Sequence, residues 1–279
     1  MKRLYLLEYE YLKSSPATMG QFQSHDNYEI FYFHEGKGNY VIGDKIHVLT
    51  PGTLIVMHGM TLHTPKSFDG YPYVRTLLNF DPGYFRAASK HVCSVNPLEP
   101  FEKLGNHKVQ LNEQDREEFE ELLRKMNRLY SAVDAFSKER FRVTCLEVLF
   151  FICQVIMKPV EEDIALPSEK EQHVQHALTY IENHYMMDIC LDQLEGYLHI
   201  NKYYLVRLFR EVTGMTMFQY ISKRRINQAK ILFLVEPGKS VTDICYLTGF
   251  KNLSHFSKVF KQLEGITPDQ YRRQLKSQL

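Results

Sequence analysis

A sequence repeat in the C-terminal part of the chain constrains the fold more than any other feature. The pattern Leu205-x-x-Leu208-Phe209-Arg210-x-x-x-Gly214 recurs, displaced by 51 residues, as Phe256-x-x-Val259-Phe260-Lys261-x-x-x-Gly265. In each copy the apolar residues have the spacing of one buried helix face. A glycine follows each run, as it does where a helix ends in a left-handed cap. We therefore predict two matching helices, which begin after the N-caps Asn201 and Asn252 and end at the glycines.

Each predicted helix is preceded by a shorter helix and a tight turn. The short helices are expected at 191–198 and 241–247, and a longer helix at 217–235 connects the two units. A short helix, a tight turn and a second helix with one buried face form a helix-turn-helix. The alternative for either copy alone is a helical bundle with a solvated outer face. Two copies at a fixed spacing favour a double helix-turn-helix domain.

The outer face of each second helix offers basic, hydroxyl, imidazole and apolar groups. Such a mixture suits the major groove of DNA, where Arg and Lys reach guanine or phosphate and apolar groups reach the thymine methyl. The connecting helix would hold the second helices in successive major grooves, about 34 Å apart. The candidate DNA-binding residues are Lys202, Tyr203, Val206, Arg207 and Arg210 in the first copy and Leu253, Ser254, His255, Ser257 and Lys258 in the second.

The connecting helix adds a further candidate, Arg224, within the run Lys223-Arg224-Arg225. We interpret Arg224 as a phosphate contact, and a solvent-exposed charge run is the equal alternative. The distribution of charge along the chain also favours DNA binding by the C-terminal part. Residues 168–279 carry 15 Lys and Arg against 11 Asp and Glu, whereas residues 1–167 carry 19 against 22. A cationic C-terminal part fits a nucleic-acid-binding module joined to a different domain.

The residues before this region predict an antiparallel β-domain followed by helices. Short apolar runs at 28–33, 40–42, 46–49, 54–57 and 73–78 are separated by turn signals, which is typical of a barrel or a sandwich. Helical periodicity begins after Asn112, with helices expected at 113–130 and 138–157. The fold class is therefore α+β with two domains. We place the sensor domain at 1–107, a helical dimerisation and linker region at 108–165, and the DNA-binding domain at 166–279.

Five cysteines without a C-x-x-C pair indicate neither a disulfide framework nor a zinc finger. The sequence has no apolar run of membrane-spanning length and its start does not read as a signal peptide, so we expect a cytoplasmic protein without membrane contact.

The C-terminal motifs resemble the signature of the AraC/XylS family of bacterial regulators. The resemblance is carried by 201–214, by Arg224-Arg225-Ile226-x-x-Ala229, by 241–250, by 255–261 and by Gly265-Ile266-Thr267-Pro268-x-x-Tyr271-Arg272. It implies that each subunit binds two adjacent major grooves of double-stranded DNA through the residues named above. It also implies activation of nearby genes, often for carbohydrate use, by recruitment of RNA polymerase. The homodimer is expected on a different ground: the helices at 112–157, above all the one at 138–157, carry more apolar residues than one buried stripe needs.

Three positions depart from that family pattern. Glu195 and Cys245 stand where the family usually has alanine in the first helix of each unit. Cys245 is small enough to pack, but Glu195 puts tight packing of the first unit in doubt. Leu253 occupies a position that is often polar, which suggests weaker base reading by the second unit.

The N-terminal part resembles the cupin pattern, in which His and Glu side chains on neighbouring strands point into a small barrel. The pattern is carried by His25-Asp26-Asn27-Tyr28-Glu29, Gly36, Pro51-Gly52 and His63, and Gln23 stands where metal-binding cupins have a first histidine. Alternation along the strand places Phe31 on the face of Glu29. We therefore predict that His25, Glu29, Phe31 and His63 bind a small organic effector, with no metal and no cofactor. By family analogy, the segment before Gln21 would form an arm over this pocket.

The resulting hypothesis is a homodimeric transcription regulator that is not an enzyme and has no catalytic residues. A small molecule, with a sugar as the leading candidate, would bind in a cupin-like barrel. Two alternatives stay open at this point. The first is a metal-dependent cupin enzyme fused to a DNA-binding domain, and the second is a regulator whose barrel serves only for dimerisation. The structural alternative for His25 and His63 is that they merely cap strand ends.

Overall fold

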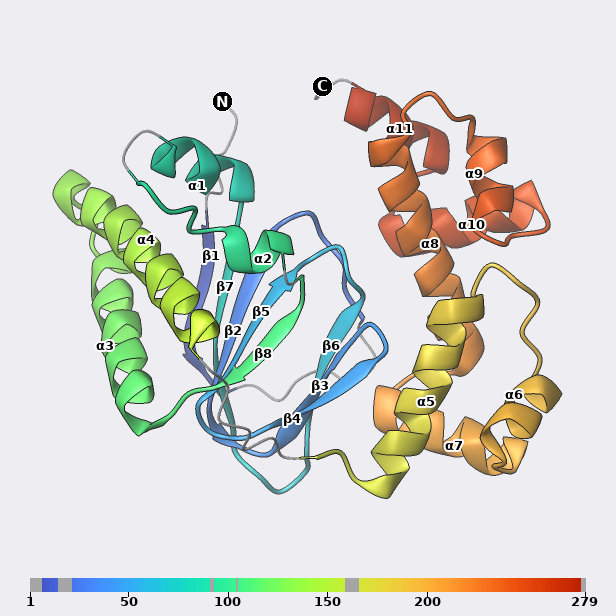
Figure 1. Cartoon of the computed structure of the whole chain (residues 1–279). Coiled ribbons are helices and arrows are strands. Elements are labelled where there is room, and N and C mark those ends of the chain that lie inside the picture. Colours follow the sequence, from blue (N-terminus) through green and yellow to red (C-terminus); the bar gives the residue numbers. More distant parts are fainter. Residues whose placement is uncertain (1–6, 15–21, 91–92, 104, 159–165, 277–279) are drawn as a thin grey trace.

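Two antiparallel sheets form the N-terminal domain of the computed structural model (Figure 1), which describes residues 7–14, 22–90, 93–103, 105–158 and 166–276. The larger sheet has the strand order β1-β7-β2-β5-β8 and the smaller one β4-β3-β6. Every paired strand runs antiparallel to its neighbour. The strands are β1 Leu7–Lys13, β2 Tyr28–Gly36, β3 Gly38–Ile42, β4 Lys45–Leu49, β5 Thr53–His58, β6 His63–Ser67, β7 Tyr73–Phe80 and β8 His107–Gln110.

The two sheets face each other across an aromatic core. Phe31 and Phe33 of β2 point into it and meet Tyr40 of β3, whereas Tyr28, Ile30 and Tyr32 point to the outer face of the larger sheet. This division confirms the alternation read from the sequence, since successive strand residues face opposite sides. All residues of β3 are buried because its outer face is covered as well.

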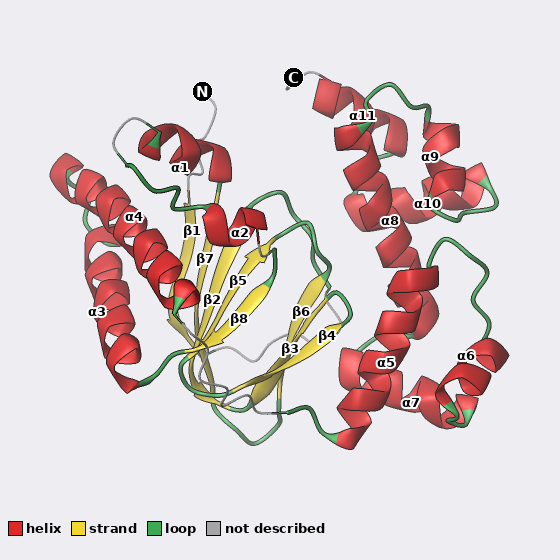
Figure 2. Cartoon of the chain, in the orientation of Figure 1, coloured by secondary structure: helices red, strands yellow, loops and turns green. Residues whose placement is uncertain are grey.

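Helices cover the outer face of the larger sheet (Figure 2). They are α1 Pro82–Ser89, α2 Glu99–Lys103, α3 Glu113–Tyr130 and α4 Ala135–Met157. Asn112 caps α3 as predicted, with its side chain accepting from the Asp115 backbone N–H. Helix α4 starts three residues before the predicted position because Asp134 caps it. Cys145, Leu149 and most of the other buried residues of α4 pack with the sheet and α3 in one apolar cluster.

The C-terminal domain is entirely helical in its described residues. Its helices are α5 Glu169–His184, α6 Leu191–Leu198, α7 Lys202–Thr213, α8 Met217–Val235, α9 Val241–Leu247, α10 Leu253–Glu264 and α11 Pro268–Lys276. The predicted short helices, second helices and connecting helix are all confirmed. Two helix-turn-helix units, α6-α7 and α9-α10, are joined by α8 (Figure 1). None of the described helices combines the length and the apolar character that a bilayer crossing requires.

The N-terminal domain differs from the predicted barrel in its closure. No strand pair joins the two sheets among the described residues, so the domain is an open two-sheet arrangement. One isolated bridge links Gln23 to His63 and ties the segment before β2 to the smaller sheet. Part of the expected arm, 7–13, forms edge strand β1 instead, because its backbone pairs with β7. Residues 1–6 and 15–20 of the expected arm lie outside the described residues. So do residues 159–165, at the end of the expected linker region.

Candidate functional site

Both second helices of the helix-turn-helix units begin and end as their sequences predict. The Asn201 side chain accepts hydrogen bonds from the second and third backbone N–H groups of α7, at 3.0 and 3.3 Å. Asn252 does the same for α10, at 2.8 and 3.0 Å. Gly214 and Gly265 both end their helices at φ 77°, in the left-handed region that favours glycine. Matching caps define two rigid helices of equal length.

The predicted DNA-binding residues of α7 share the solvent-facing side of that helix. Tyr203, Arg207 and Arg210 are exposed, and Lys202 and Val206 are partly exposed. Lys202 forms an ion pair with Asp192 of α6, and the Arg207 guanidinium lies 5.5 Å from the centroid of the Tyr204 ring. The helix therefore presents two exposed arginines that form no ion pair with the other described residues, and an exposed tyrosine beside them.

The predicted DNA-binding residues of α10 also face solvent. Leu253, Ser254, His255 and Lys258 are exposed, and Ser257 is partly exposed. The opposite side of α10 buries Phe256 and Phe260 completely. This strict division into a buried aromatic side and a polar outer side leaves the outer residues available for a partner.

The two departures from the family pattern in the first helices of the units have different structural consequences. Cys245 is fully buried and packs in the apolar cluster of the second unit. Glu195 is only partly exposed, and its carboxylate accepts a hydrogen bond from the backbone N–H of Lys202 at 3.3 Å. The first unit thus replaces a close helix contact with a polar cap on the start of α7.

Arg224 occupies a different setting from the other predicted DNA contacts. Its side chain is 17% exposed, and its Nε lies 2.6 Å from the Glu182 carboxylate of α5. The guanidinium also stacks 4.1 Å from the centre of the Tyr185 ring. A phosphate contact by Arg224 would require this network to open, so the structure places it apart from the residues on α7 and α10.

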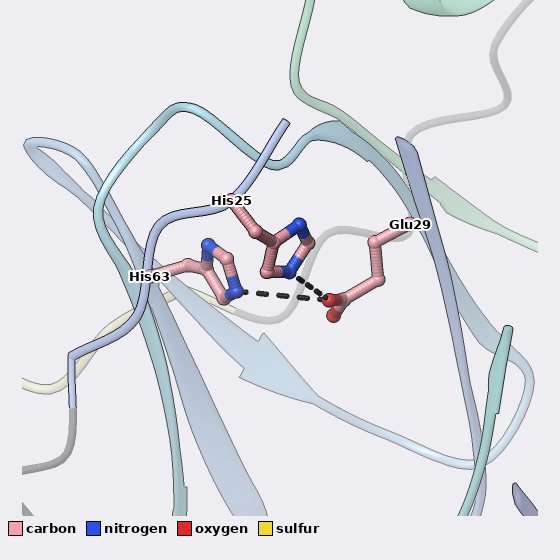
Figure 3. Close-up of side chains that lie close together, drawn as sticks. All are labelled: His25, Glu29 and His63. Carbon is pink, nitrogen blue, oxygen red and sulfur yellow. Dashed lines mark hydrogen bonds and ion pairs between the residues drawn. The ribbon is translucent and has the colours of Figure 1, made fainter. Parts of the chain in front are cut away.

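Three of the four predicted effector residues converge at one point of the N-terminal domain (Figure 3). His25 precedes β2, Glu29 lies on β2 and His63 begins β6, and one ligand atom from each lies within 4.8 Å of the others. His25 Nε2 is 3.3 Å and His63 Nε2 is 3.6 Å from the same Glu29 oxygen. Glu29 and His63 are each 2% exposed. Both histidines therefore do more than cap strand ends.

Tyr40 is a member of this cluster that the sequence analysis missed. Its hydroxyl donates a hydrogen bond to the other Glu29 oxygen at 2.9 Å. The Phe31 ring packs at 4.7 Å from the Tyr40 ring, so the fourth predicted residue contacts the cluster through Tyr40. The alternation of β3 places Tyr40 on the inner face, but only strand pairing shows which inner residue faces Glu29.

Burial and hydrogen bonding set the charges of the cluster. Burial by itself would raise the pKa of Glu29, but the charge of His63, the contact with His25 and the hydrogen bond from Tyr40 hold that pKa below its usual range. Burial opposes protonation of His25, but the hydrogen bond and charge of Glu29 outweigh it and raise the His25 pKa. For His63, burial dominates and lowers the pKa. The site thus favours the ionised form of the Glu29 carboxylate and shifts the pKa values of its two histidines in opposite directions.

Comparisons with known proteins assign both halves of the chain. Residues 17–143 match the family described as AraC-like ligand binding domain, and residues 194–274 match the family described as helix-turn-helix domain. The chain belongs to the AraC family. The fold and the motifs of its C-terminal domain agree with this assignment.

Relatives of this AraC-family chain are named as regulators. An uncharacterised HTH-type transcriptional regulator of Pseudoalteromonas carrageenovora is 39% identical over 37% of this chain and 61% of its own length. The HTH-type transcriptional activator RhaS of Klebsiella pneumoniae is 23% identical over 89% of this chain and 86% of its own. The melibiose operon regulatory protein of Escherichia coli is 32% identical over 36% and 33%. The chain therefore spans less than two thirds of the first relative and of the third.

The two domains of this AraC-family chain are in direct contact, which the sequence analysis did not predict. Val41 and Ile46 of the smaller sheet share an apolar cluster with α5, α7 and α8. The Tyr220 hydroxyl of α8 lies 3.0 Å from the Gly43 carbonyl oxygen and 2.9 Å from a Glu182 carboxylate oxygen, and its single O–H donates to one of these acceptors at a time. The sensor domain therefore contacts the helix that connects the two helix-turn-helix units.

Further contacts join α8 to the loops around the His-Glu cluster. Lys223 donates to the Phe22 carbonyl at 3.1 Å and Lys230 to the Ser24 carbonyl at 3.2 Å. Asn227 donates to the Met60 carbonyl at 2.7 Å. Lys223, assigned with Arg224 to a charge run, thus lies in a domain interface, where only the tertiary contacts define its role.

Proposed function

We propose that this chain is a sequence-specific DNA-binding transcription regulator whose activity depends on a small-molecule effector. The observation that carries the proposal is the pair of matching, rigidly capped helices α7 and α10, each with an exposed polar side, on one connecting helix (Figure 1). Two such helices suit two successive major grooves. The activator and regulator names of the relatives support the same function.

Within this proposal, the outer residues of α7 and α10 read the DNA. Arg207 and Arg210 of α7 have the length and geometry to contact guanine edges, whereas Lys202 and Lys258 suit phosphates. Arg224 contributes to DNA binding only in an arrangement in which its contact with Glu182 is released. The remaining readers are Tyr203, Val206, Leu253, Ser254, His255 and Ser257. The proposed domain limits are 1–107, 108–165 and 166–279.

Selection of bound sequences from a random DNA pool tests this function. We expect enrichment of two short elements separated by about one helical turn. In the Arg207→Ala variant, enrichment at one element should weaken while the other persists. Binding that depends only on salt, without any enriched sequence, would contradict the proposal.

The effector site is proposed at His25, Glu29, Phe31 and His63. Buried polar groups next to an aromatic core suit a small polar organic molecule. A carbohydrate is the first class to test, because one relative is named for the melibiose operon. Thermal unfolding with a panel of sugars is the measurement, and a binding sugar should raise the midpoint in the native chain but not in Glu29→Gln. DNA binding without any effector response would leave the regulator function intact and reject this site.

A homodimer is proposed through α3 and α4. Their outer surface forms a groove of about 560 Å³ that includes Leu122, Val143, Leu146 and Phe150, and Val143 is 63% exposed. The apolar surplus that the sequence of α4 carries is thus divided between the sheet and this groove. We expect Val143→Asp to shift the chain to a monomer in light-scattering measurements, while the exposed polar change Gln154→Ser in the same groove should not. Recruitment of RNA polymerase by the DNA-bound dimer is part of the proposal.

A further inference from the structure

The hydrogen bonds of the two clustered histidines fix where their protons are. His63 Nδ1 lies 2.8 Å from the Thr61 carbonyl and His25 Nδ1 lies 3.3 Å from the Asn27 carbonyl. A carbonyl only accepts hydrogen bonds, so each Nδ1 carries a hydrogen. A neutral imidazole has one N–H, so in the neutral form of both rings each Nε2 carries a lone pair.

Both Nε2 atoms face the same Glu29 oxygen, at 3.3 and 3.6 Å. Three electron-pair donors thus converge, two of them on residues that are 2% exposed. Buried donors that face one another without a positive charge between them are costly. A proton on His25 would satisfy one of the two contacts, but the His63 lone pair would still face the carboxylate. One divalent cation would satisfy all three donors at once.

The spacing fits such a cation. Zinc binds nitrogen and oxygen ligands at about 2.0–2.2 Å, which separates the ligand atoms of a tetrahedral site by roughly 3.4 Å. The two observed separations from the Glu29 oxygen, 3.3 and 3.6 Å, lie on either side of that value. The surroundings agree as well. Metal-binding histidines usually donate their second ring N–H to a carbonyl or carboxylate, as both histidines do here.

We propose that His25, Glu29 and His63 bind a divalent transition-metal ion, with zinc as the first candidate. Two imidazoles and one carboxylate are a donor set typical of zinc and iron sites that keep an open position. Tyr40 donates to the second Glu29 oxygen and thereby leaves the first for the metal. The proposal departs from the sequence-based expectation of no metal, which depended on Gln23 in place of a first histidine.

The location of this metal site gives it a mechanical consequence. The metal would join the segment 22–25 to β2 and β6, and this segment supplies the Phe22 and Ser24 carbonyls that Lys223 and Lys230 of α8 contact. Gln23 is paired to His63 through two backbone hydrogen bonds, at 2.9 and 3.1 Å. An occupied site would therefore stiffen the loop on which the connecting helix of the two helix-turn-helix units rests.

Metal binding to the full chain, freed of metal by chelation, tests the proposal without DNA or any effector. The probes are Zn²⁺ in competition with a chromophoric chelator, and Co²⁺, whose visible absorption reports nitrogen and oxygen coordination. We expect one equivalent to bind and to raise the unfolding midpoint. Loss of a ligand in Glu29→Gln or His63→Ala should weaken the binding at least as much as the 10–100-fold typical of an outer-shell change. The control His176→Ala removes an exposed histidine of α5 and should bind as the native chain does.

Two results would overturn the proposal. The first is an affinity for Zn²⁺ that Glu29→Gln leaves unchanged. The second is a loss in His176→Ala equal to that in the cluster variants, which would indicate surface histidines. If Glu29→Gln or His63→Ala does not fold, His25→Ala takes its place, because the His25 side chain is 26% exposed and tolerates truncation. The metal takes the three donors that the effector proposal assigns to direct contact with an organic molecule. Because the probes are metals alone, failure of the proposed DNA binding or of the sugar response would leave this result unaffected.

Discussion

The two helix-turn-helix units have the same local design but different surroundings. Helices α7 and α10 each have 12 residues, an asparagine N-cap and a left-handed glycine at the end. The first unit shares its apolar cluster with α5 and with Phe22, Val41, Ile46 and Leu62 of the sensor domain. The second unit forms a separate cluster with the end of α8 and with α11. The repeat thus specifies each unit, and packing gives only the first a large contact with the sensor.

It follows from this difference that effector binding to the sensor domain can affect DNA recognition by the first unit more than by the second. A change in the sensor domain reaches α7 directly, through the shared cluster and through Lys66, which donates to the Glu211 carbonyl at 2.9 Å. It reaches α10 through α8, which contacts both units. We therefore expect the first unit to be the more sensitive to the sensor, and the following predictions test that comparison.

The largest expected effect belongs to the turn of the second unit. Gly249 has φ +87°, and an added Cβ would lie 2.6 Å from the Met186 carbonyl oxygen. Gly249→Ala should destabilise the second unit by about 2–4 kcal/mol, since backbone strain and a backbone clash add. Gly265→Ala is the matched control, because its φ is +77° and no atom lies within 4 Å of the added Cβ. Hydrogen exchange of α9 and α10 is the measurement, and equal effects of the two changes would contradict the clash.

A smaller effect is expected in DNA binding. Here the variant of the first unit should lose affinity at one base pair, and the variant of the second unit should lose affinity for all sequences. Arg207→Ala should cost about 1–3 kcal/mol at its own base pair if it reads guanine. Lys258→Ala should weaken binding to all sequences alike and reduce the slope of log affinity against log salt by about 1. Titrations of enriched and scrambled DNA at several salt concentrations separate the two results. Uniform weakening by both variants would remove the proposed difference in base reading.

The contact between the sensor domain and α8 should contribute less free energy than the upper end of the range expected for the Arg207 base contact. Tyr220→Phe removes the hydroxyl that donates to the Gly43 carbonyl or to Glu182 and should lower the free energy of unfolding by about 1–2 kcal/mol. Tyr271→Phe in the second unit is the control, because the Tyr271 ring packs on Phe233 and Phe260 within the apolar cluster of that unit, and the substitution keeps the ring. Chemical denaturation measures both. A larger loss in Tyr271→Phe would reverse the comparison between the units.

The smallest effect should be the same in both units. Asn201→Ala and Asn252→Ala each remove a side-chain cap and should destabilise their own helix by about 1 kcal/mol. Hydrogen exchange of the backbone amides in the first turn of each helix measures how far that turn frays. The sensor domain packs against part of the first unit. If Asn201→Ala destabilises its helix more than Asn252→Ala does, the difference measures how far that packing depends on the start of α7.

Prediction from the sequence was most successful where local rules decide. The caps Asn112, Asn201 and Asn252 and the ends of α7 and α10 follow from residue types a few positions apart. The missed elements lack such signals. Strand β6 contains Pro65 and four polar residues, and it exists because its backbone pairs with β3. Helix α2 is only five residues long, too short for a reliable period.

The candidate site divides in the same way. The sequence named His25, Glu29 and His63, because their types and order resemble a known pattern. Tyr40 was missed because its role depends on which strand lies opposite Glu29, and strand pairing is a non-local property. The engagement of Arg224 by Glu182 was missed for the same reason, since the two residues are 42 positions apart.

The sequence by itself determined the elements of this protein that depend on neighbours along the chain. These are the two helix-turn-helix units, the alternation of β2 and the types of residue that could form a site. Only the tertiary structure decided which residues meet, including the convergence of three donors on one Glu29 oxygen and the contact of α8 with the sensor domain. The physical reason is range. Helix periodicity and capping act over about four residues, whereas burial and strand pairing join segments that the chain itself holds far apart.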